Sequence, residues 1–222
     1  MLQCVILDGG YHGEKLYDTE YKSCYENNFP TEPVPYQKEL PVLIRQLGQL
    51  LKDQGYSVYY TRCDYIAGED ALDADSLQQS APIHMITPSK VTELVNDMFL
   101  NGTTEYSAEN ACLLSFHRTL LLCPGQCGNA EIFVCQHGTP ASGLAYSIMQ
   151  ELEAIGLHNH GIQERPNLTI LRCSKIPALF ITLGNLPLSS AQAKENTALI
   201  QDMAEAFARG ICSFFTSSPS VL

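Results

Sequence analysis

Two histidines follow predicted strands at places where they could hold one metal ion together. His12 comes shortly after the apolar run VIL, and His117 ends the run LLSF. Two histidines and one carboxylate leave a coordination position open on zinc, which is the arrangement of a catalytic zinc site. Glu14 lies beside His12 and Glu39 precedes a predicted helix, so either could supply the carboxylate. The alternative interpretation is that both histidines are polar side chains at a loop edge with satisfied hydrogen bonds.

A second group of possible zinc ligands lies within the segment CPGQCGNAEIFVCQHG. Its four candidates for a structural zinc site are Cys123, Cys127, Cys135 and His137. The spacing of the first two around Pro-Gly suits chelation at a tight turn. Two alternatives stay open: Cys135 belongs to the core at the end of a strand, or Cys123 and Cys127 form a disulfide in an oxidising compartment.

The nine cysteines are too scattered, and odd in number, for a small secreted disulfide framework. We expect buried free thiols in a reducing compartment, where cysteine behaves as a small hydrophobic residue. Four of them lie in apolar strand-like runs: Cys4, Cys112, Cys135 and Cys173. Cys63, directly after Arg62, is the best candidate for a nucleophilic thiol, but the sequence implies no histidine beside it.

The composition limits the partners. The net charge is -11 and no run of Lys or Arg occurs, which argues against nucleic acid and anionic membranes. No apolar run approaches the roughly 20 residues that a membrane span needs. The N-terminus lacks the basic and apolar regions of a signal peptide. We therefore expect a cytoplasmic location, or a periplasmic or other extracytoplasmic one if a signal peptide has been removed.

The elements that must position these residues alternate between strands and helices. Apolar runs predict six strands, at residues 2–7, 57–62, 111–116, 130–135, 168–172 and 178–183. Helical spacing of apolar residues predicts helices at about 40–54, 89–100, 140–155 and 190–215. Ser89 is the expected N-cap of the second helix, and Gly55 the C′ residue of the first. The histidines in HNH, residues 158–160, are expected in a solvated turn.

This alternation predicts one α/β domain with a six-stranded, mainly parallel, twisted sheet and helices on both faces. Ligands of such sheets collect at the carboxyl ends of the strands. The residues expected there are Asp8 to His12, Thr61 and Arg62, His117, and Thr182 to Asn185.

Six segments, in order, resemble the zinc-dependent N-acetylmuramoyl-L-alanine amidases of the type-3 amidase fold. They are DGGYHG, QGYSVYYTR, LLSFH, GNAEIFV, NLTILR with PALFITLGN, and MAEAFARGICSFF. The resemblance covers nearly the whole chain except residues 14–38 and about 63–110. It implies one amidase-like domain over residues 1–222 with an unusual acidic insertion at about 63–110. That insertion could be a lid, a partner surface or a solvated loop.

The resemblance also implies roles for individual residues. Zinc would be held by His12, Glu39 and His117. Thr182 stands where the family has its general-base glutamate, and Glu131 would support the chemistry. The substrate would be bound by Tyr11, Arg62 and Asn185.

The departures from the family pattern fall on these working positions. Without a gap, the family's first histidine ligand aligns on Tyr11, one residue before His12. Its glutamate ligand aligns on Tyr36, three residues before Glu39. Its general base aligns on Thr182, whose hydroxyl cannot take a proton near pH 7 as a carboxylate does.

These departures predict a binding or regulatory protein that is related to the peptidoglycan amidases and catalytically impaired or inactive. Its partner would be a peptidoglycan fragment or a protein. The alternative is an active zinc amidase with shifted ligands that cleaves the bond between MurNAc and L-alanine.

Overall fold

The computed structural model describes residues 3–9, 39–61, 87–100, 106, 109–119, 129–184 and 193–217. The strands are β1 (Cys4–Gly9), β2 (Ser57–Tyr60), β3 (Ala111–Thr119), β4 (Asn129–Val134), β5 (His158–Glu164) and β6 (Ala178–Gly184). The helices are α2 (Glu39–Asp53), α4 (Pro88–Leu100), α5 (Pro140–Ala154), α6 (Thr169–Arg172) and α7 (Ala193–Ser217). None of the described helices combines the length and the apolar character that a membrane crossing requires.

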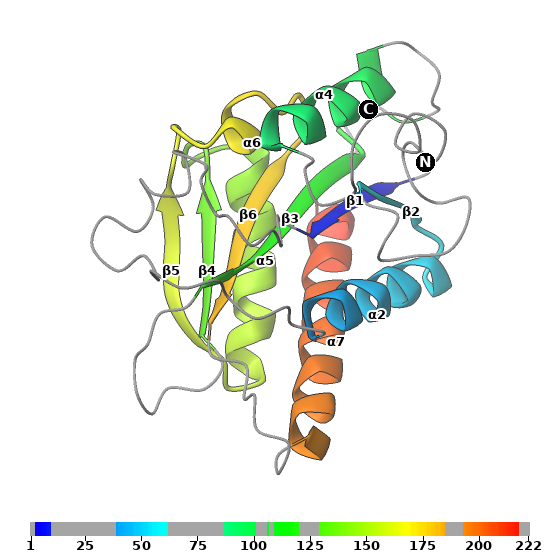
Figure 1. Cartoon of the computed structure of the whole chain (residues 1–222), viewed down its shortest axis with the longest axis vertical. Coiled ribbons are helices and arrows are strands. Elements are labelled where there is room, and N and C mark those ends of the chain that lie inside the picture. Colours follow the sequence, from blue (N-terminus) through cyan, green and yellow to red (C-terminus); the bar gives the residue numbers. More distant parts are fainter. Residues whose placement is uncertain are drawn as a thin grey trace.

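The strands form one six-stranded sheet in the order β2-β1-β3-β6-β4-β5, which Figure 1 shows from right to left. The pairs β1–β2, β1–β3, β3–β6 and β4–β5 are parallel. The fifth pair of the described strands, β4–β6, is antiparallel. Strands β4 and β5 therefore run against the other four strands. The predicted mainly parallel sheet is therefore confirmed, with one reversal next to β6.

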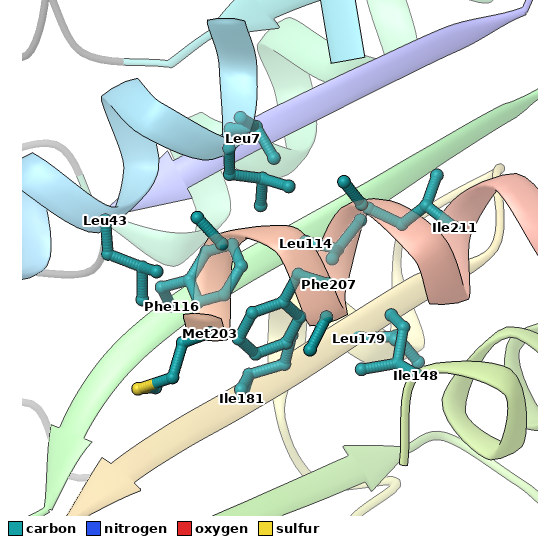
Figure 2. Packing of buried hydrophobic residues seen from close by; sticks show 14 of the residues in the cluster. Leu7, Leu43, Leu114, Phe116, Ile148, Leu179, Ile181, Met203, Phe207 and Ile211 are labelled. Atoms are coloured by element: carbon teal, nitrogen blue, oxygen red, sulfur yellow. The ribbon is translucent and has the colours of Figure 1, made fainter. Parts of the chain in front are cut away.

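One face of the sheet packs against α2, α5 and α7. Side chains on a strand alternate between the two faces, and Leu7, Leu114 and Phe116 point into this larger core. Figure 2 shows Phe116 of β3 against Phe207 of α7, and their ring centroids are 5.1 Å apart in an edge-to-face arrangement. This face is apolar along the strands, so polar strand residues must be sought on the other one.

The opposite face packs against α4 and α6, which lie beside each other at the top of Figure 1. Its core includes Ile6 and Leu113 from the sheet, with Val91 and Val95 from α4 and Ile170 from α6. Helices on both faces are thus confirmed. This core fills only the first part of β1 and β3, because the residues that follow on the same face are polar.

The prediction of a strand at residues 168–172 was wrong. Residues 169–172 form the single helical turn α6, and the strand is β5, which includes the HNH segment expected in a solvated turn. A short apolar run cannot by itself distinguish a strand from a buried helical turn. β5 lies at the edge of the sheet, and its sequence HNHGIQE contains a single aliphatic residue, so it leaves no apolar pattern to detect.

The ends of two helices test the capping predictions. Gly55 has a φ of 88°, as expected for the residue that ends α2. Ser89 is not the N-cap of α4, since Thr87 accepts a hydrogen bond from the Lys90 amide at 3.3 Å. Pro88 then occupies the first helical position, where its fixed φ and missing N–H are tolerated.

The expectation of buried thiols holds for two of the four cysteines in question. Cys4 and Cys112 are fully buried, and burial raises the pKa of Cys4 to about 12. Burial and the neighbouring Cys4 also raise the pKa of Cys112. Cys135 is only half-buried, and Cys173 is exposed because the run before it is α6 and not a strand. Cys63 lies outside the described residues.

Candidate functional site

Two cross-strand rows of side chains cross the α4–α6 face near the ends of β1, β3 and β6. Strand register aligns Asp8, Ser115, Phe180 and Phe133, which we call the inner row. Two residues farther toward the carboxyl ends of β3 and β6, the strand register aligns His117, Thr182 and Glu131. We call these three residues the outer row. β4 contributes to both rows because it runs antiparallel to β6, which brings the beginning of β4 to this edge.

The residues of the inner row on β1 and β3 belong to a chain of hydrogen bonds. Thr61, just after β2, donates from its hydroxyl to Asp8 Oδ1. Ser115 donates to Asp8 Oδ2 at 2.5 Å, and the same hydroxyl lies 2.6 Å from His117 Nε2. All four side chains are at least 95% buried. The chain therefore joins the ends of β2, β1 and β3 and connects a carboxylate to the imidazole of the outer row.

Aromatic packing holds the His117 ring in place. The ring stacks on Phe180 of β6, with centroids 3.8 Å apart and planes 12° from parallel. Phe180 contacts Phe133 edge-on at 5.9 Å, and Arg165 lies over the Phe133 ring at 5.2 Å. The imidazole is thus fixed in plane by the stack and in rotation by its contact with Ser115.

The outer row continues from His117 to a threonine and a carboxylate. Thr182 is fully buried and lies directly opposite His117 on the neighbouring strand. Its hydroxyl donates to Glu131 Oε2 at 3.1 Å. The carboxylate of this row therefore stands on β4, one strand farther from His117 than position 182.

The structure brings together three of the residues predicted for the site: His117, Thr182 and Glu131. Contrary to the prediction that His117 ends its strand, β3 continues to Thr119. Glu39 is the first residue of α2, and nothing is described of its side chain. The predicted residues His12, Tyr11, Arg62 and Asn185 lie outside the described part of the chain, as do Glu14 and Tyr36.

The predicted cysteine–histidine cluster is only partly described. Cys135 and His137 follow the end of β4, in the turn that leads to α5, and not in a strand. His137 is exposed, and its backbone amide donates to Glu164 Oε1 at 2.7 Å. Cys123 and Cys127 lie outside the described residues, so neither the structural zinc site nor the disulfide is tested.

Sequence reasoning missed the role of Ser115. Asp8 and Thr61 were identified as strand-end residues, but Ser115 lies inside an apolar run and drew no attention. Residues two apart on a strand share a face, so Ser115 had to lie beside His117 once β3 was recognised. That spacing was the available signal.

Of the three zinc ligands that the sequence predicts, His117 is the one whose side chain lies in the described part of the chain. No group of three His, Cys, Asp or Glu side chains placed to hold a metal occurs among the described residues. His117 does have the environment of a ligand, because one ring nitrogen contacts a hydroxyl that is itself bonded to a carboxylate. Partners of this kind orient metal-binding histidines in proteins.

Comparison with known proteins relates this site to one fold. No protein-family model matches the sequence, and none of the curated proteins does. An N-acetylmuramoyl-L-alanine amidase from Clostridium difficile 630 superposes with a TM-score of 0.64 at 18% identity, covering 98% of both chains.

Two further solved structures agree. The CwlD amidase from Clostridioides difficile, solved in complex with the GerS lipoprotein, gives a TM-score of 0.60 at 16% identity over 96% of this chain and 98% of that one. The amidase AmiC2 of Nostoc punctiforme gives 0.58 at 16% identity, over 96% and 97%. The chain therefore has the fold of the N-acetylmuramoyl-L-alanine amidases, as the order of its sequence motifs predicted.

Proposed function

We propose that this protein binds a peptidoglycan fragment and hydrolyses its MurNAc–L-Ala amide poorly or not at all. The observation that carries the proposal is Thr182. It lies in the outer row directly opposite His117, at the position where the resemblance expects the general base. Its hydroxyl is fully buried and donates to Glu131, so it acts as a hydrogen-bond donor and not as a proton acceptor.

The expected loss of rate follows from the chemistry of that position. A general base typically contributes about 10²–10⁴-fold to such a reaction. Glu131 is the nearest carboxylate of the row, but it stands across Thr182 from His117. A base displaced by one strand would meet the attacking water in a different place, so Glu131 does not replace the missing glutamate in this proposal.

Zinc belongs to the proposal through His12, Glu39 and His117. When bound, zinc would polarise the amide carbonyl and lower the pKa of a water molecule. His117 fits this role by its place at the sheet edge and by its contact with Ser115. The other two ligands, His12 and Glu39, are proposed from the sequence alone, one and three residues after the positions where the family pattern has its ligands.

A protein partner is the second candidate. Among the structurally similar proteins, CwlD was solved in complex with the GerS lipoprotein. An amidase-fold protein with weak hydrolysis could serve as such a binding subunit.

The decisive experiment measures binding and cleavage of one ligand, a muramyl dipeptide that contains the MurNAc–L-Ala bond. Calorimetry should show binding, and chromatography should show little or no released peptide. Tyr146→Ala, at an exposed residue of α5, is the control variant that should bind normally. Absence of binding would contradict the proposal, and turnover at the rate of an active amidase would support the alternative of an active enzyme.

Elemental analysis of protein purified without added metal tests the zinc site. Zinc that is present in the parent protein and lost in His117→Ala supports the ligand set proposed here. Zinc that survives in His117→Ala but is lost in His137→Ala points to the cysteine–histidine cluster. Absence of zinc from the parent protein would refute the metal part of the proposal.

A further inference from the structure

The hydrogen bonds around Asp8 leave little freedom in where their protons lie. Each hydroxyl has one proton to donate, and an ionised carboxylate only accepts. Thr61 donates to one oxygen of Asp8, and Ser115 donates to the other at 2.5 Å. Both carboxylate oxygens therefore have a donor, and the proton of Ser115 is already used.

This assignment decides the contact between Ser115 and His117. Ser115 Oγ lies 2.6 Å from His117 Nε2, which is a hydrogen-bond distance. Because the serine proton points to Asp8, the hydroxyl oxygen can only accept from the imidazole, so Nε2 must carry a proton. In a neutral imidazole one nitrogen is a donor and the other an acceptor, which leaves the lone pair on Nδ1.

We infer that Asp8 and Ser115 are positioning residues that hold the proton of His117 on Nε2 and thereby present the lone pair of Nδ1 to the ligand of the site. Both are strand residues on one row, so their spacing is set by backbone pairing and not by a loop. The stack on Phe180, at 3.8 Å, keeps the imidazole in the same plane. A lone pair on Nδ1 could accept a hydrogen bond from a ligand or bind a metal ion.

The competing explanation is that the same bonds only satisfy buried polar groups. Under that explanation the proton could sit on either nitrogen, since Ser115 could equally donate to Nε2. The inference deepens the proposed function, because it names Nδ1 as the atom of His117 that would contact the ligand. In that sense the inference rests on the proposed function. Its test uses the protein without any ligand, so a failure to bind a peptidoglycan fragment would leave the result readable.

The test is nitrogen NMR of the full-length protein labelled with ¹⁵N-histidine. His117→Gln identifies the signals of His117 among the six histidines. Spectra are recorded at about pH 8, above the ordinary histidine pKa of roughly 6.5. We expect a directly bonded proton on Nε2 and the strongly downfield resonance of an unprotonated nitrogen on Nδ1. A His117 ring that is protonated on Nδ1, alone or together with Nε2, would overturn the inference.

Asp8→Asn gives the sharper result because it should reverse the direction of the hydrogen bonds that join residue 8, Ser115 and His117. An amide offers one accepting oxygen and one NH2 group, which only donates, in place of two accepting oxygens. Ser115 has a second acceptor within reach in His117 Nε2, so the amide should donate to Ser115 and the serine proton should turn to Nε2. The proton of the imidazole then moves to Nδ1, and the two nitrogen resonances exchange their positions. A spectrum equal to that of the parent, in a variant with parental melting, would refute the role of the carboxylate.

Ser115→Ala provides a second variant if the buried amide prevents folding. It removes the acceptor of Nε2, so the Nε2–H signal should shift and exchange faster with water. Thr182→Val is the matched control, because it removes a buried hydroxyl that lies next to His117 but outside the chain. It should leave both nitrogen resonances in place. A Ser115→Ala spectrum that matches the control would also overturn the inference.

Discussion

Replacing Thr182 by glutamate restores the residue that the resemblance expects and also creates a conflict. Positions 182 and 131 are directly opposite on an antiparallel pair, where Cβ atoms lie about 4.5–5.5 Å apart. The hydroxyl of Thr182 already contacts Glu131 Oε2 at 3.1 Å. Thr182→Glu would therefore place a second carboxylate against the first in a buried environment.

The size of this conflict follows from Coulomb's law. Two unit charges about 5 Å apart repel by about 3 kcal/mol at an effective dielectric constant of about 20. That energy corresponds to about two pH units in the titration of the pair. Burial at position 182, which is fully covered, acts in the same direction because it disfavours the charged form.

The consequence is a loss of stability with rising pH. A carboxyl whose pKa is higher in the folded than in the unfolded state stabilises the protein fully below the unfolded pKa of about 4.3. That contribution is lost as the pH rises through the raised pKa of the folded state. Compared with Thr182→Gln, Thr182→Glu should lose about 3 kcal/mol of unfolding free energy between about pH 4.5 and 7.5.

Urea denaturation of both variants across this pH range measures the difference directly. Glu131→Gln in the Thr182→Glu background should remove the part of the pH dependence that charge repulsion causes and leave the part due to burial, which makes the comparison a double-mutant cycle. A difference between the Glu and Gln variants that stays constant with pH would refute the reasoning. For amidase activity the same logic favours Thr182→Glu combined with Glu131→Gln over Thr182→Glu alone, since only the pair of changes frees the new carboxylate to accept a proton.

Further predictions concern packing and the cysteines. Gly210→Ala should cost about 1–3 kcal/mol in urea denaturation, because its Cβ would lie 2.5 Å from Ile148 Cα. The control Gly143→Ala, whose Cβ would meet only ordinary contacts, should gain roughly 0.5–1 kcal/mol; equal effects would contradict the packing argument. The raised pKa of Cys4, about 12, means that stability falls as the pH rises above about 8.5. Cys4→Ala should reduce that slope by up to about 1.4 kcal/mol per unit between about pH 9 and 11, and an unchanged slope would count against burial of the thiol. Iodoacetamide followed by mass spectrometry should modify the exposed Cys173 and spare Cys4 in the folded protein, whereas equal labelling would contradict the difference in burial.

The fold was predictable where apolar runs were long or central. The strands that became β1, β3 and β6 are buried on both faces and read as continuous apolar segments. β5 was missed because an edge strand keeps polar residues, and α6 was taken for a strand because four residues show no period. The reversal of β4 was also invisible, since direction in a sheet depends on pairing with β6 and not on the composition of the strand.

Individual residues of the candidate site could be predicted from the sequence, but the hydrogen bonds between them could not. His117, Thr182 and Glu131 came from motif order, and the structure places them on one row. The hydrogen bond between Asp8 and Ser115 depends on strand register, which brings together two residues 107 positions apart in the sequence. No local pattern encodes that alignment, because it follows from how two distant strands pair.

The reversal of β4 also explains how a carboxylate reaches this end of the sheet although position 182 is a threonine. Ligands usually meet the carboxyl ends of parallel strands, which would direct attention to β1, β3 and β6 alone. Because β4 runs the other way, its first three residues lie at this same end of the sheet, and Glu131 belongs to the outer row. The acidic group of the site is therefore present but displaced by one strand, and the hydroxyl of Thr182 connects it to the row. In the described part of the site, the imidazole of His117 and the carboxylate of Glu131 are therefore separated by the buried side chain of Thr182.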